Sequence, residues 1–228
     1  MAKVLIVGAS RGIGLELAKQ HAAAGNEVIA GARDPDGATL LADAAKEHDN
    51  ITVEQVDVAD PASVEAAGKR LSGAIDDVYV VAGATGGMKQ SLDDIDLEEW
   101  HRTFDVNTIG PFLVARAFKP HLVASGNGKL MIVSSQLAAS TWPFGGFYVY
   151  GTTKAAVNKV GQILALDWKD EPITVALMHP GYVQTDMGGP NAEITPEESA
   201  SGIRSVMAGL TKADSGKFYK WNGDIHPW

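Results

Sequence analysis

Short apolar runs alternate along the whole chain with longer segments in which apolar residues recur at helical spacing. The short runs are typical of buried strands, and the longer segments are typical of helices packed on a sheet. The predicted strands span 4–7, 27–30, 51–56, 77–81, 128–133, 174–178 and 217–219, and the predicted helices span 12–24, 40–47, 61–71, 97–123, 150–168 and 195–210. This alternation predicts an α/β fold with a doubly wound, mostly parallel sheet of about seven strands flanked by helices.

A glycine-rich loop, GASRGIG, joins the first predicted strand to the first predicted helix. Its glycines at 8, 12 and 14 allow a tight turn and a close approach of the backbone to a ligand. Free N–H groups at the start of a helix attract phosphate, and parallel sheets bind ligands at the carboxyl ends of their strands. The loop therefore predicts a bound dinucleotide, although a glycine-rich turn that binds nothing has the same pattern.

Charged residues near the end of the second strand bear on which dinucleotide binds. Arg33 follows the small Ala32, and Arg11 lies in the glycine loop. A basic residue here suits the 2′-phosphate of NADP, whereas an acidic one suits the ribose 2′-OH of NAD. The two cations favour NADP(H) over NAD(H). Asp34 competes with this interpretation, because it could pair with Arg33 on the surface or bind the ribose itself.

Two further strand ends carry residues suited to a cofactor. Asp57 follows the third strand, where it could accept a hydrogen bond from the adenine amino group or cap the next turn. Ala82 and Gly83 follow the fourth strand, where small residues let a cofactor lie against the backbone. A flexible turn needs the same small residues.

The predicted helix 97–123 contains Asn107 and, four residues later, Pro111. Proline has no N–H, so the carbonyl of Asn107 loses its usual partner and the helix is expected to kink there. A water bound by that carbonyl could join a proton relay to Lys154. A kink that serves only packing is the alternative.

The side chains needed for acid–base chemistry follow the fifth strand. Tyr150 and Lys154 are four residues apart, so on a helix they share a face. An ammonium group stabilises a phenolate and brings the phenol pKa from about 10 toward neutrality. Ser134 and Ser135 add hydroxyl groups, but adjacent strand residues point to opposite faces, so the sequence leaves open which of them is involved.

Two loops are suited to a substrate. The segment 142–147 contains Trp142, Phe144 and Phe147, which could wall a pocket or simply pack. The segment HPGYVQTDMGGP follows the sixth strand and is rich in glycine and proline, so we expect a lid within a substrate-loop region of about 181–210.

Composition restricts the possible partners. The net charge of −9 disfavours nucleic acids and anionic membranes, and the lack of cysteine excludes disulfides and thiolate metal sites. No HExxH-type histidine pair is present, so no metal is expected.

The first apolar run is too short for a membrane span, and no cleavage site is evident, which predicts a cytoplasmic protein. With no Pro/Gly/Ser-rich linker, residues 1–228 are expected to form a single domain.

In their order and spacing these motifs resemble the short-chain dehydrogenase/reductase family over essentially the whole chain. The resemblance rests on GASRGIG at 8–14, Asn107, Ser135, YGTTK at 150–154 and PGYVQT at 180–185. The closing segments, HPGYVQTDMGGPNAEITPEES and DSGKFYKWNGDIHPW, look like the C-factor branch, which is related to the sniffer-type carbonyl reductases. A single Rossmann-type domain is implied.

The resemblance also implies roles for individual residues. Tyr150 would be the general acid/base, Ser135 would donate to the substrate oxygen, and Lys154 would lower the pKa of Tyr150 and bind the nicotinamide ribose. Asn107 would bind a relay water. Ser134 remains the alternative hydroxyl, and Tyr148 competes with Tyr150 but has no lysine four residues later.

The cofactor contacts would be Gly8, Ser10, Arg11, Gly12, Ile13 and Gly14 at the phosphates, Asp57 and Val58 at adenine, and Pro180, Gly181, Val183 and Thr185 at nicotinamide.

One segment departs from the family pattern. Where the family usually has Asn-Asn-Ala-Gly after the fourth strand, Val80 and Val81 precede Ala82 and Gly83. The loss of an amide is expected to reduce local rigidity and cofactor affinity.

The resemblance implies an NADP(H)-dependent oxidoreductase that interconverts a carbonyl and an alcohol on a small molecule. Members of the family generally self-associate, so a homodimer or homotetramer is expected. The alternative function is a dinucleotide-binding signalling or sensor protein with little turnover, because C-factor-like folds also serve signalling.

Overall fold

Seven strands form one sheet in the computed structural model, which describes residues 1–87 and 90–228. The sheet order is β3-β2-β1-β4-β5-β6-β7, and every strand pairing is parallel. The strands are β1 (Lys3–Val7), β2 (Glu27–Ala32), β3 (Ile51–Gln55), β4 (Asp77–Val80), β5 (Gly128–Val133), β6 (Ile173–His179) and β7 (Phe218–Lys220). The predicted α/β fold is confirmed, with a fully parallel sheet.

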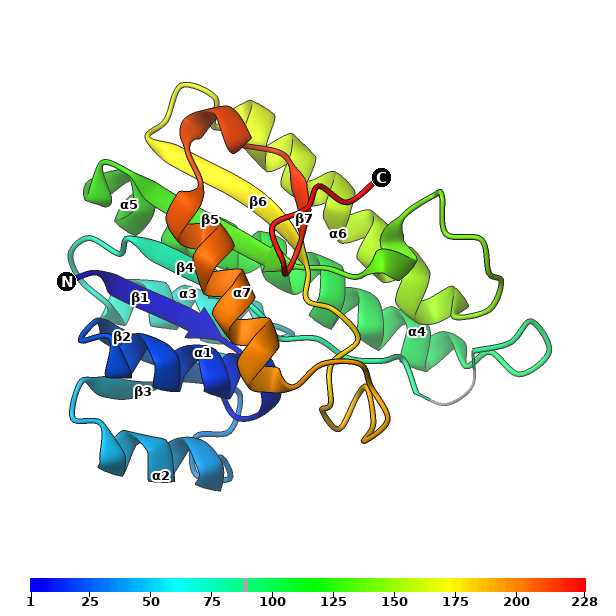
Figure 1. Cartoon of the computed structure of the whole chain (residues 1–228), viewed down its shortest axis with the longest axis horizontal. Helices are drawn as coiled ribbons and strands as arrows, with labels where there is room; N and C mark the ends of the chain where they lie inside the picture. Colours follow the sequence, from blue (N-terminus) through cyan, green and yellow to red (C-terminus); the bar gives the residue numbers. More distant parts are fainter. Residues whose placement is uncertain (88–89) are drawn as a thin grey trace.

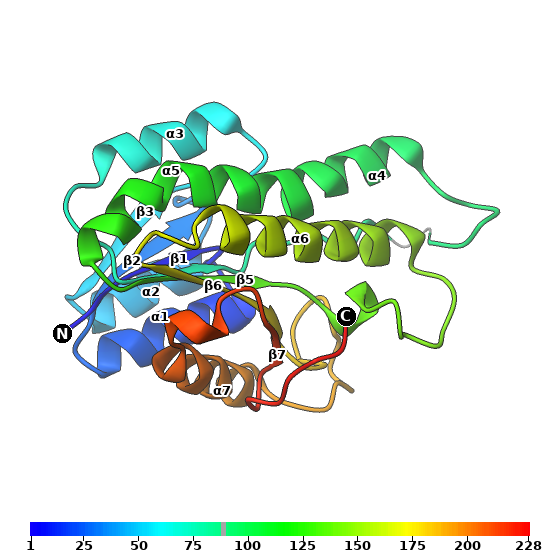
Figure 2. The same cartoon turned by 90° about the horizontal axis from the view of Figure 1, so that it is seen from above.

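Helices cover both faces of this sheet (Figures 1 and 2). Figure 2 shows α3, α5 and α6 on one side and α1 and α7 on the other. The helices are α1 (Gly12–Ala23), α2 (Thr39–Glu47), α3 (Pro61–Arg70), α4 (Leu97–Phe104), α5 (Gly110–Ser125), α6 (Tyr148–Asp167) and α7 (Pro196–Gly209), with the short turns η1 (Asp105–Ile109), η2 (Gln136–Ala138) and η3 (Lys212–Asp214). No helix among the described residues has the length and apolar character needed to cross a bilayer.

The strands are apolar on both faces because each face packs against helices. In β1, Leu5 and Val7 belong to the core under α3, α5 and α6, whereas Val4 and Ile6 belong to the core under α1 and α7. All four side chains are fully buried. Burying one such side chain stabilises the fold by about 1.5–3 kcal/mol relative to leaving it exposed. This two-sided burial explains why the strand reads as a continuous apolar run instead of an alternating one.

The sheet order reverses between β1 and β4. The chain leaves β1 toward β2 on one side, and it leaves β4 toward β5 on the other, so the loops after β1 and β4 diverge at the carboxyl edge. Backbone hydrogen bonds of 2.9 Å fix both loops, from Gly8 N to Gly31 O and from Ala82 N to Val7 O. Doubly wound sheets bind ligands at this reversal, so the fold brings the glycine loop to the expected place.

The predicted helix 97–123 is realised as α4, η1 and α5, which continue one another and end at Ser125. The turn η1 is a π-helix in which Gly110 N–H donates to the carbonyl of Asp105, five residues earlier. Pro111 has no N–H for the carbonyl of Asn107, and the wider π turn accommodates that loss. The predicted kink is therefore a π turn with Asn107 buried inside it.

Helix α6 begins at Tyr148, two residues before the predicted start. Phe147 has a φ of 55°, in the left-handed region that non-glycine residues rarely adopt, and it separates the aromatic loop from the helix. Its side chain does not cap the helix. Instead, Gln90 Oε1 accepts a hydrogen bond from Tyr150 N at 3.2 Å. A cap supplied by a distant residue leaves no signal in the local sequence, so the sequence predicted this start only to within two residues.

Candidate active site

The glycine loop is tightly packed at two of its three glycines. A Cβ on Gly8 would lie 2.5 Å from Ala82 N, and one on Gly14 would lie 2.1 Å from Gly8 O. Gly8 also has a φ of 98°, which a side chain would strain. Only glycine therefore lets α1 start directly against the turn and lets the loop after β4 pass beside it.

The start of α1 is suited to a phosphate. Arg11 is the N-cap residue, but its side chain makes no capping hydrogen bond, and no acidic residue occupies the first turn. The N–H groups at the start of a helix lack intrahelical partners and carry the positive end of the helix dipole. The predicted dinucleotide thus fits here, with Ser10, Gly12 and Ile13 around the same turn.

The glycine loop meets the segment after β6. A Cβ on Gly12 would lie 3.1 Å from Thr185 Cγ2. Arg11 Nη1 donates to Asp186 Oδ2 at 2.9 Å, in an ion pair whose side chains are both about three-quarters exposed. Such exposed pairs contribute about 0–1 kcal/mol, so the Arg11 side chain is free to exchange Asp186 for another anion.

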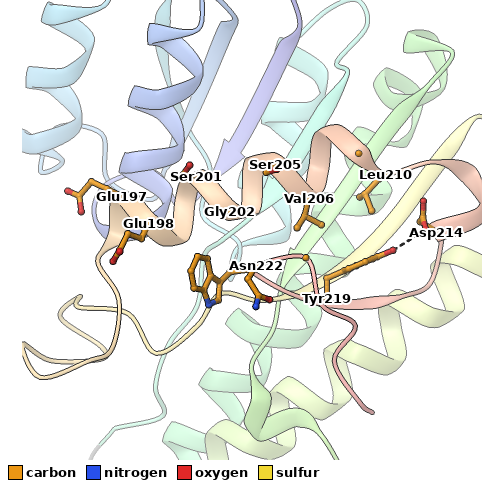
Figure 3. A pocket seen from close by; sticks show the side chains of 13 residues that line it. Glu197, Glu198, Ser201, Gly202, Ser205, Val206, Leu210, Asp214, Tyr219 and Asn222 are labelled. Atoms are coloured by element: carbon orange, nitrogen blue, oxygen red, sulfur yellow. Dashed lines mark hydrogen bonds between the residues drawn. The ribbon is translucent and has the colours of Figure 1, made fainter.

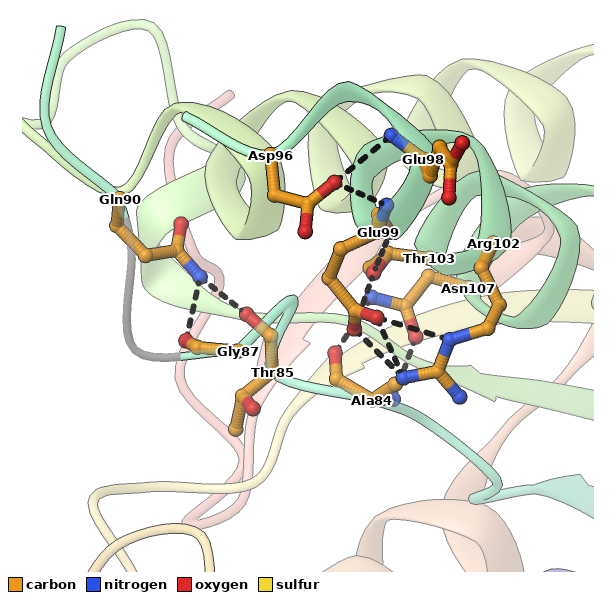
Figure 4. A network of polar contacts seen from close by, with 10 residues as sticks. All are labelled: Ala84, Thr85, Gly87, Gln90, Asp96, Glu98, Glu99, Arg102, Thr103 and Asn107. Carbon is orange, nitrogen blue, oxygen red and sulfur yellow. Dashed lines mark hydrogen bonds and ion pairs between the residues drawn. The ribbon is translucent and has the colours of Figure 1, made fainter. Parts of the chain in front are cut away.

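Asn107, in η1, connects the loop after β4 to α6. Figure 4 shows its contact with Ala84. Its Oδ1 accepts from Ala84 N at 2.8 Å, and its Nδ2 donates to Ala84 O at 2.9 Å and to Thr153 Oγ1 at 3.0 Å. Thr153 Oγ1 in turn donates to Tyr150 O at 2.8 Å. The fully buried amide of Asn107 therefore links Ala84 to the residue beside Lys154. The relay water assigned to its backbone carbonyl stays a prediction.

Replacing Asn107 by alanine is expected to lower the free energy of unfolding by about 2–5 kcal/mol. The change leaves the backbone N–H and carbonyl of Ala84 and the hydroxyl of Thr153 without their partner, and each buried unpaired group costs about 1–3 kcal/mol. Urea denaturation measures the loss. Asn191→Ala, at an exposed position, is the control. An unchanged urea midpoint in Asn107→Ala would contradict the structural role of Asn107.

Lys154 reaches the end of β5 from helix α6. Its side chain is 4% exposed, and its Nζ donates to Val133 O at 2.9 Å. A Cβ on Gly83 would lie 3.4 Å from both Lys154 Nζ and Asn107 Oδ1, so the loop after β4 passes directly over the ammonium group. Burial lowers the pKa of Lys154 to about 8.

The two serines differ in what they contact. Ser134 is 1% exposed, and its Oγ donates to Lys154 O at 3.3 Å, so its hydroxyl is used within the protein. Ser135 Oγ accepts from Leu137 N at 3.2 Å and is hydrogen-bonded to the Tyr150 side chain. Ser135 is thus the serine that shares a hydrogen bond with the phenol.

Burial raises the pKa of Tyr150 to about 12, and the hydrogen bond from Ser135 only partly offsets this rise. The resemblance implied the opposite direction, with Lys154 lowering the pKa. In the protein alone, Lys154 Nζ lies 5.8 Å from the centre of the Tyr150 ring and donates to the Val133 carbonyl instead. Desolvation of the phenolate therefore sets the direction of the shift, and Tyr150 is protonated at neutral pH.

The expected adenine end of the site lies at β2 and β3. Arg33 is exposed, and no ion pair of its guanidinium is found in the part of the chain that the structure describes. Asp34 Oδ1 accepts from Gly37 N at 3.2 Å, and Asp57 Oδ1 accepts from Ala59 N at 3.0 Å. Both carboxylates thus stabilise their own turns. The adenine role of Asp57 stays a prediction.

Val58, Val80 and Val81 are packing residues in the structure. Val58 is 5% exposed and packs so closely that a Cβ on Gly110 would lie 2.8 Å from its own Cβ. Val80 belongs to the core under α5 and α6, and Val81 packs against the opposite core. The missing family amide is thus replaced by apolar packing, while Asn107 holds Ala84. The predicted loss of cofactor affinity stays untested.

The segment after β6 folds back on itself beside α7. Pro180 O accepts from Ser199 Oγ at 2.7 Å, and Val183 pairs with Ile194. Gly181 has a φ of 92°, and a Cβ there would lie 2.5 Å from Ile194 Cδ1. These contacts form the base of the predicted lid.

Two residues that support the site were missed from the sequence. Thr153 joins Asn107 to the Tyr150 carbonyl. Gln90 caps α6 through its Oε1, and its Nε2 donates to Thr85 O and Gly87 O (Figure 4). Thr153 could have been noticed as the residue next to Lys154 in YGTTK. Gln90 has no such signal, because it lies 60 residues from its partner Tyr150.

A hollow of about 840 Å³ lies elsewhere, between α7 and the segment after β7 (Figure 3). Glu197, Glu198, Tyr219 and Trp221 are among its lining residues, and none of the predicted catalytic or cofactor residues is. Among the described residues, no group of three or more His, Asp or Glu side chains could hold a metal ion. Ser135, Tyr150 and Lys154 converge at the carboxyl edge of the sheet, and this edge is the candidate active site.

Comparison with known proteins finds relatives over the whole chain. Residues 2–195 match the family model described as short chain dehydrogenase. The chain is 35% identical over 237 residues to 1-hydroxy-2-glutathionyl-2-methyl-3-butene dehydrogenase of Rhodococcus sp. (strain AD45), covering 100% of both proteins. It is 36% identical over 155 residues to C-signal of Myxococcus xanthus, covering 67% of this chain and 92% of that protein.

Solved structures show the same similarity. Carbonyl reductase Sniffer of D. melanogaster superposes with a TM-score of 0.93 at 25% identity, and 100% of both chains is covered. The NADPH-bound carbonyl reductase from chicken fatty liver superposes with a TM-score of 0.91 at 31% identity, covering 100% of this chain and 99% of that one.

Proposed function

The chain belongs to the short-chain dehydrogenase/reductase family, in its C-factor and sniffer branch, and we propose that it is an NADP(H)-dependent enzyme that interconverts a carbonyl and an alcohol with Tyr150 as general acid/base. Because it belongs to this family, the chain is an oxidoreductase. One observation carries the proposal: Ser135 and Lys154 lie beside Tyr150 at the carboxyl edge of the sheet. The loop after β4 joins this group to the glycine loop, because Gly83 lies beside the Lys154 ammonium and Ala82 lies beside Gly8.

The first turn of α1 and the glycine loop would hold the cofactor phosphates, and Lys154 would hold the nicotinamide ribose. When bound, the nicotinamide supplies or accepts the hydride. In the direction of reduction, Ser135 Oγ donates a hydrogen bond to the substrate oxygen and Tyr150 Oη gives it a proton. The raised pKa keeps that proton on Tyr150 at neutral pH, and the ammonium of Lys154 stabilises the phenolate that remains.

The test is a panel of aldehydes, ketones and alcohols, each assayed with NADP(H) and with NAD(H). The proposal expects turnover of apolar carbonyl compounds, because Phe144, Phe147, Tyr182 and Met187 expose apolar surface in the loops at this edge. Tight NADPH binding without turnover across the panel would favour the alternative of a signalling or sensor protein. The similarity to C-signal is the observation that supports this alternative.

Replacing Arg33 by alanine is expected to raise the KM for NADPH by about 10–100-fold and to leave that for NADH within about threefold. A charge-assisted contact to the 2′-phosphate contributes about 1.5–3 kcal/mol, and NADH lacks that phosphate. Steady-state kinetics with both cofactors measure the ratio. Arg116→Ala, an exposed arginine on α5, is the matched control. Equal effects on the two cofactors would contradict the role of Arg33.

We also propose a homodimer or homotetramer. Helices α5 and α6, which family members often use for association, expose Phe112, Ile163 and Leu166 on this chain. Exposed apolar side chains on neighbouring helices suit a partner surface. Light scattering after size-exclusion chromatography measures the mass, and a monomer at micromolar concentration would contradict this expectation.

A further inference from the structure

His179 is a buried histidine beside the candidate active site with no assigned role. It is the last residue of β6, directly before Pro180 and Gly181, and is 8% exposed. Its Nδ1 lies 3.2 Å from the backbone nitrogen of Gln136, which donates to it. Because a ring nitrogen that accepts an N–H carries no proton, the hydrogen bond indicates the tautomer protonated at Nε2.

This hydrogen bond holds the segment that carries Ser135. On one side of Ser135, Ser134 N donates to Met178 O at 2.7 Å in the last hydrogen bond between β5 and β6. On the other side, Gln136 N donates to the His179 ring. Two consecutive residues of β6 therefore hold the two neighbours of Ser135. The segment enters η2 with the Ser135 hydroxyl directed at Tyr150 and at Leu137 N.

The surroundings keep His179 neutral and in place. Burial, together with the nearby His226 and Lys220, lowers its pKa to about 4. The ring of His226 packs edge-on at 5.4 Å, and Phe218 packs on His226 at 4.6 Å. The His179 ring is thus an acceptor throughout the neutral range, and it has little freedom to turn away from Gln136.

We propose that His179 is a positioning residue, an inference that rests on the proposed function. By accepting the N–H of Gln136, His179 holds the Ser135 hydroxyl toward Tyr150 and the substrate oxygen. It touches neither substrate nor cofactor in this role. Misplacing a reacting group by about 1 Å costs on the order of 100-fold in rate, so a single backbone hydrogen bond beside Ser135 is enough to affect turnover.

The test compares His179→Asn, His179→Gln and His179→Leu. Asparagine places its Oδ1 where the histidine has Nδ1, so it can accept from Gln136, whereas glutamine places its oxygen one bond farther and leucine has no acceptor. The asparagine variant is expected to keep kcat within about threefold of the unmodified protein. The other two are expected to lose about 10–100-fold in kcat with little change in the KM for NADPH. His226→Phe keeps an aromatic ring beside His179 and is the matched control.

Amide hydrogen exchange at Gln136 reports the same hydrogen bond without any turnover. Exchange is expected to be faster in the glutamine and leucine variants than in the unmodified protein and the asparagine variant. The proposal is overturned if the asparagine variant loses as much kcat as leucine, or if Gln136 exchanges equally in all variants. If the unmodified protein reduces no carbonyl compound, the proposed function fails, and the exchange result still decides whether His179 holds this segment. If the leucine variant fails to fold, the glutamine variant gives the same comparison.

Discussion

Tyr150→Phe is expected to lower kcat for carbonyl reduction by about 10²–10⁴-fold, with the Kd for NADPH changed by less than about threefold. The substitution removes only the hydroxyl, so the ring that packs beside Lys154 remains. What is lost is the proton donor, and Ser135 cannot replace it because a serine hydroxyl is far less acidic than a phenol. Single-turnover kinetics and fluorescence titration of NADPH separate the two effects.

Tyr148→Phe is the matched control, because Tyr148 lies on the same turn of α6 and is 40% exposed. It has no lysine four residues later, and full activity is expected. The assignment of Tyr150 fails if Tyr150→Phe oxidises NADPH as fast as the unmodified protein in the presence of a carbonyl substrate, or if Tyr148→Phe loses the activity instead.

Gly14→Ala is expected to weaken NADPH binding by about 100-fold and to lower the free energy of unfolding by about 1–3 kcal/mol. The added Cβ would lie 2.1 Å from Gly8 O and 2.9 Å from Gly8 C, so α1 must move away from the turn. Overpacking of this kind costs about 1–3 kcal/mol, which corresponds to roughly 2–12 °C in melting temperature at this chain length. The displaced helix no longer directs its first N–H groups at the phosphates.

Gly209→Ala tests whether the effect belongs to the site of substitution. Gly209 is the last residue of α7, and a Cβ there would meet no atom within 4 Å. Alanine in a helix is favoured over glycine by about 0.5–1 kcal/mol, so this variant is expected to melt at the same or a slightly higher temperature. Unchanged NADPH affinity in Gly14→Ala would contradict the assignment of the loop to the phosphates.

The contrast between Gly14 and Tyr150 shows which parts of the site a sequence can predict. The need for glycine at 14 is local, because it follows from a strand, a turn and a helix joined by a few residues. The acid–base behaviour of Tyr150 is not local. The spacing to Lys154 correctly indicated that the two side chains share a face, but the pKa of Tyr150 rises because its hydroxyl group is buried.

The hydrogen-bond partners of Ser135, Asn107 and His179 likewise could not be predicted from the sequence. Which serine reaches the phenol depends on how the chain turns after β5, and that turn is held by a histidine 43 residues away from Gln136. The partners of Asn107 come from the loop after β4 and from α6, at separations of 23 and 46 residues. The order of the motifs identified the candidate residues, but it could not identify their hydrogen-bond partners.

The sequence by itself therefore determined the α/β alternation, the parallel sheet, the glycine turn and the set of candidate catalytic side chains, because apolar periodicity and glycine stereochemistry act between residues close along the chain. Only the tertiary structure decided the π turn at Asn107, the start of α6, the serine that faces Tyr150 and the direction of its pKa shift. Those features depend on hydrogen bonds and desolvation between segments that meet only when the sheet has formed.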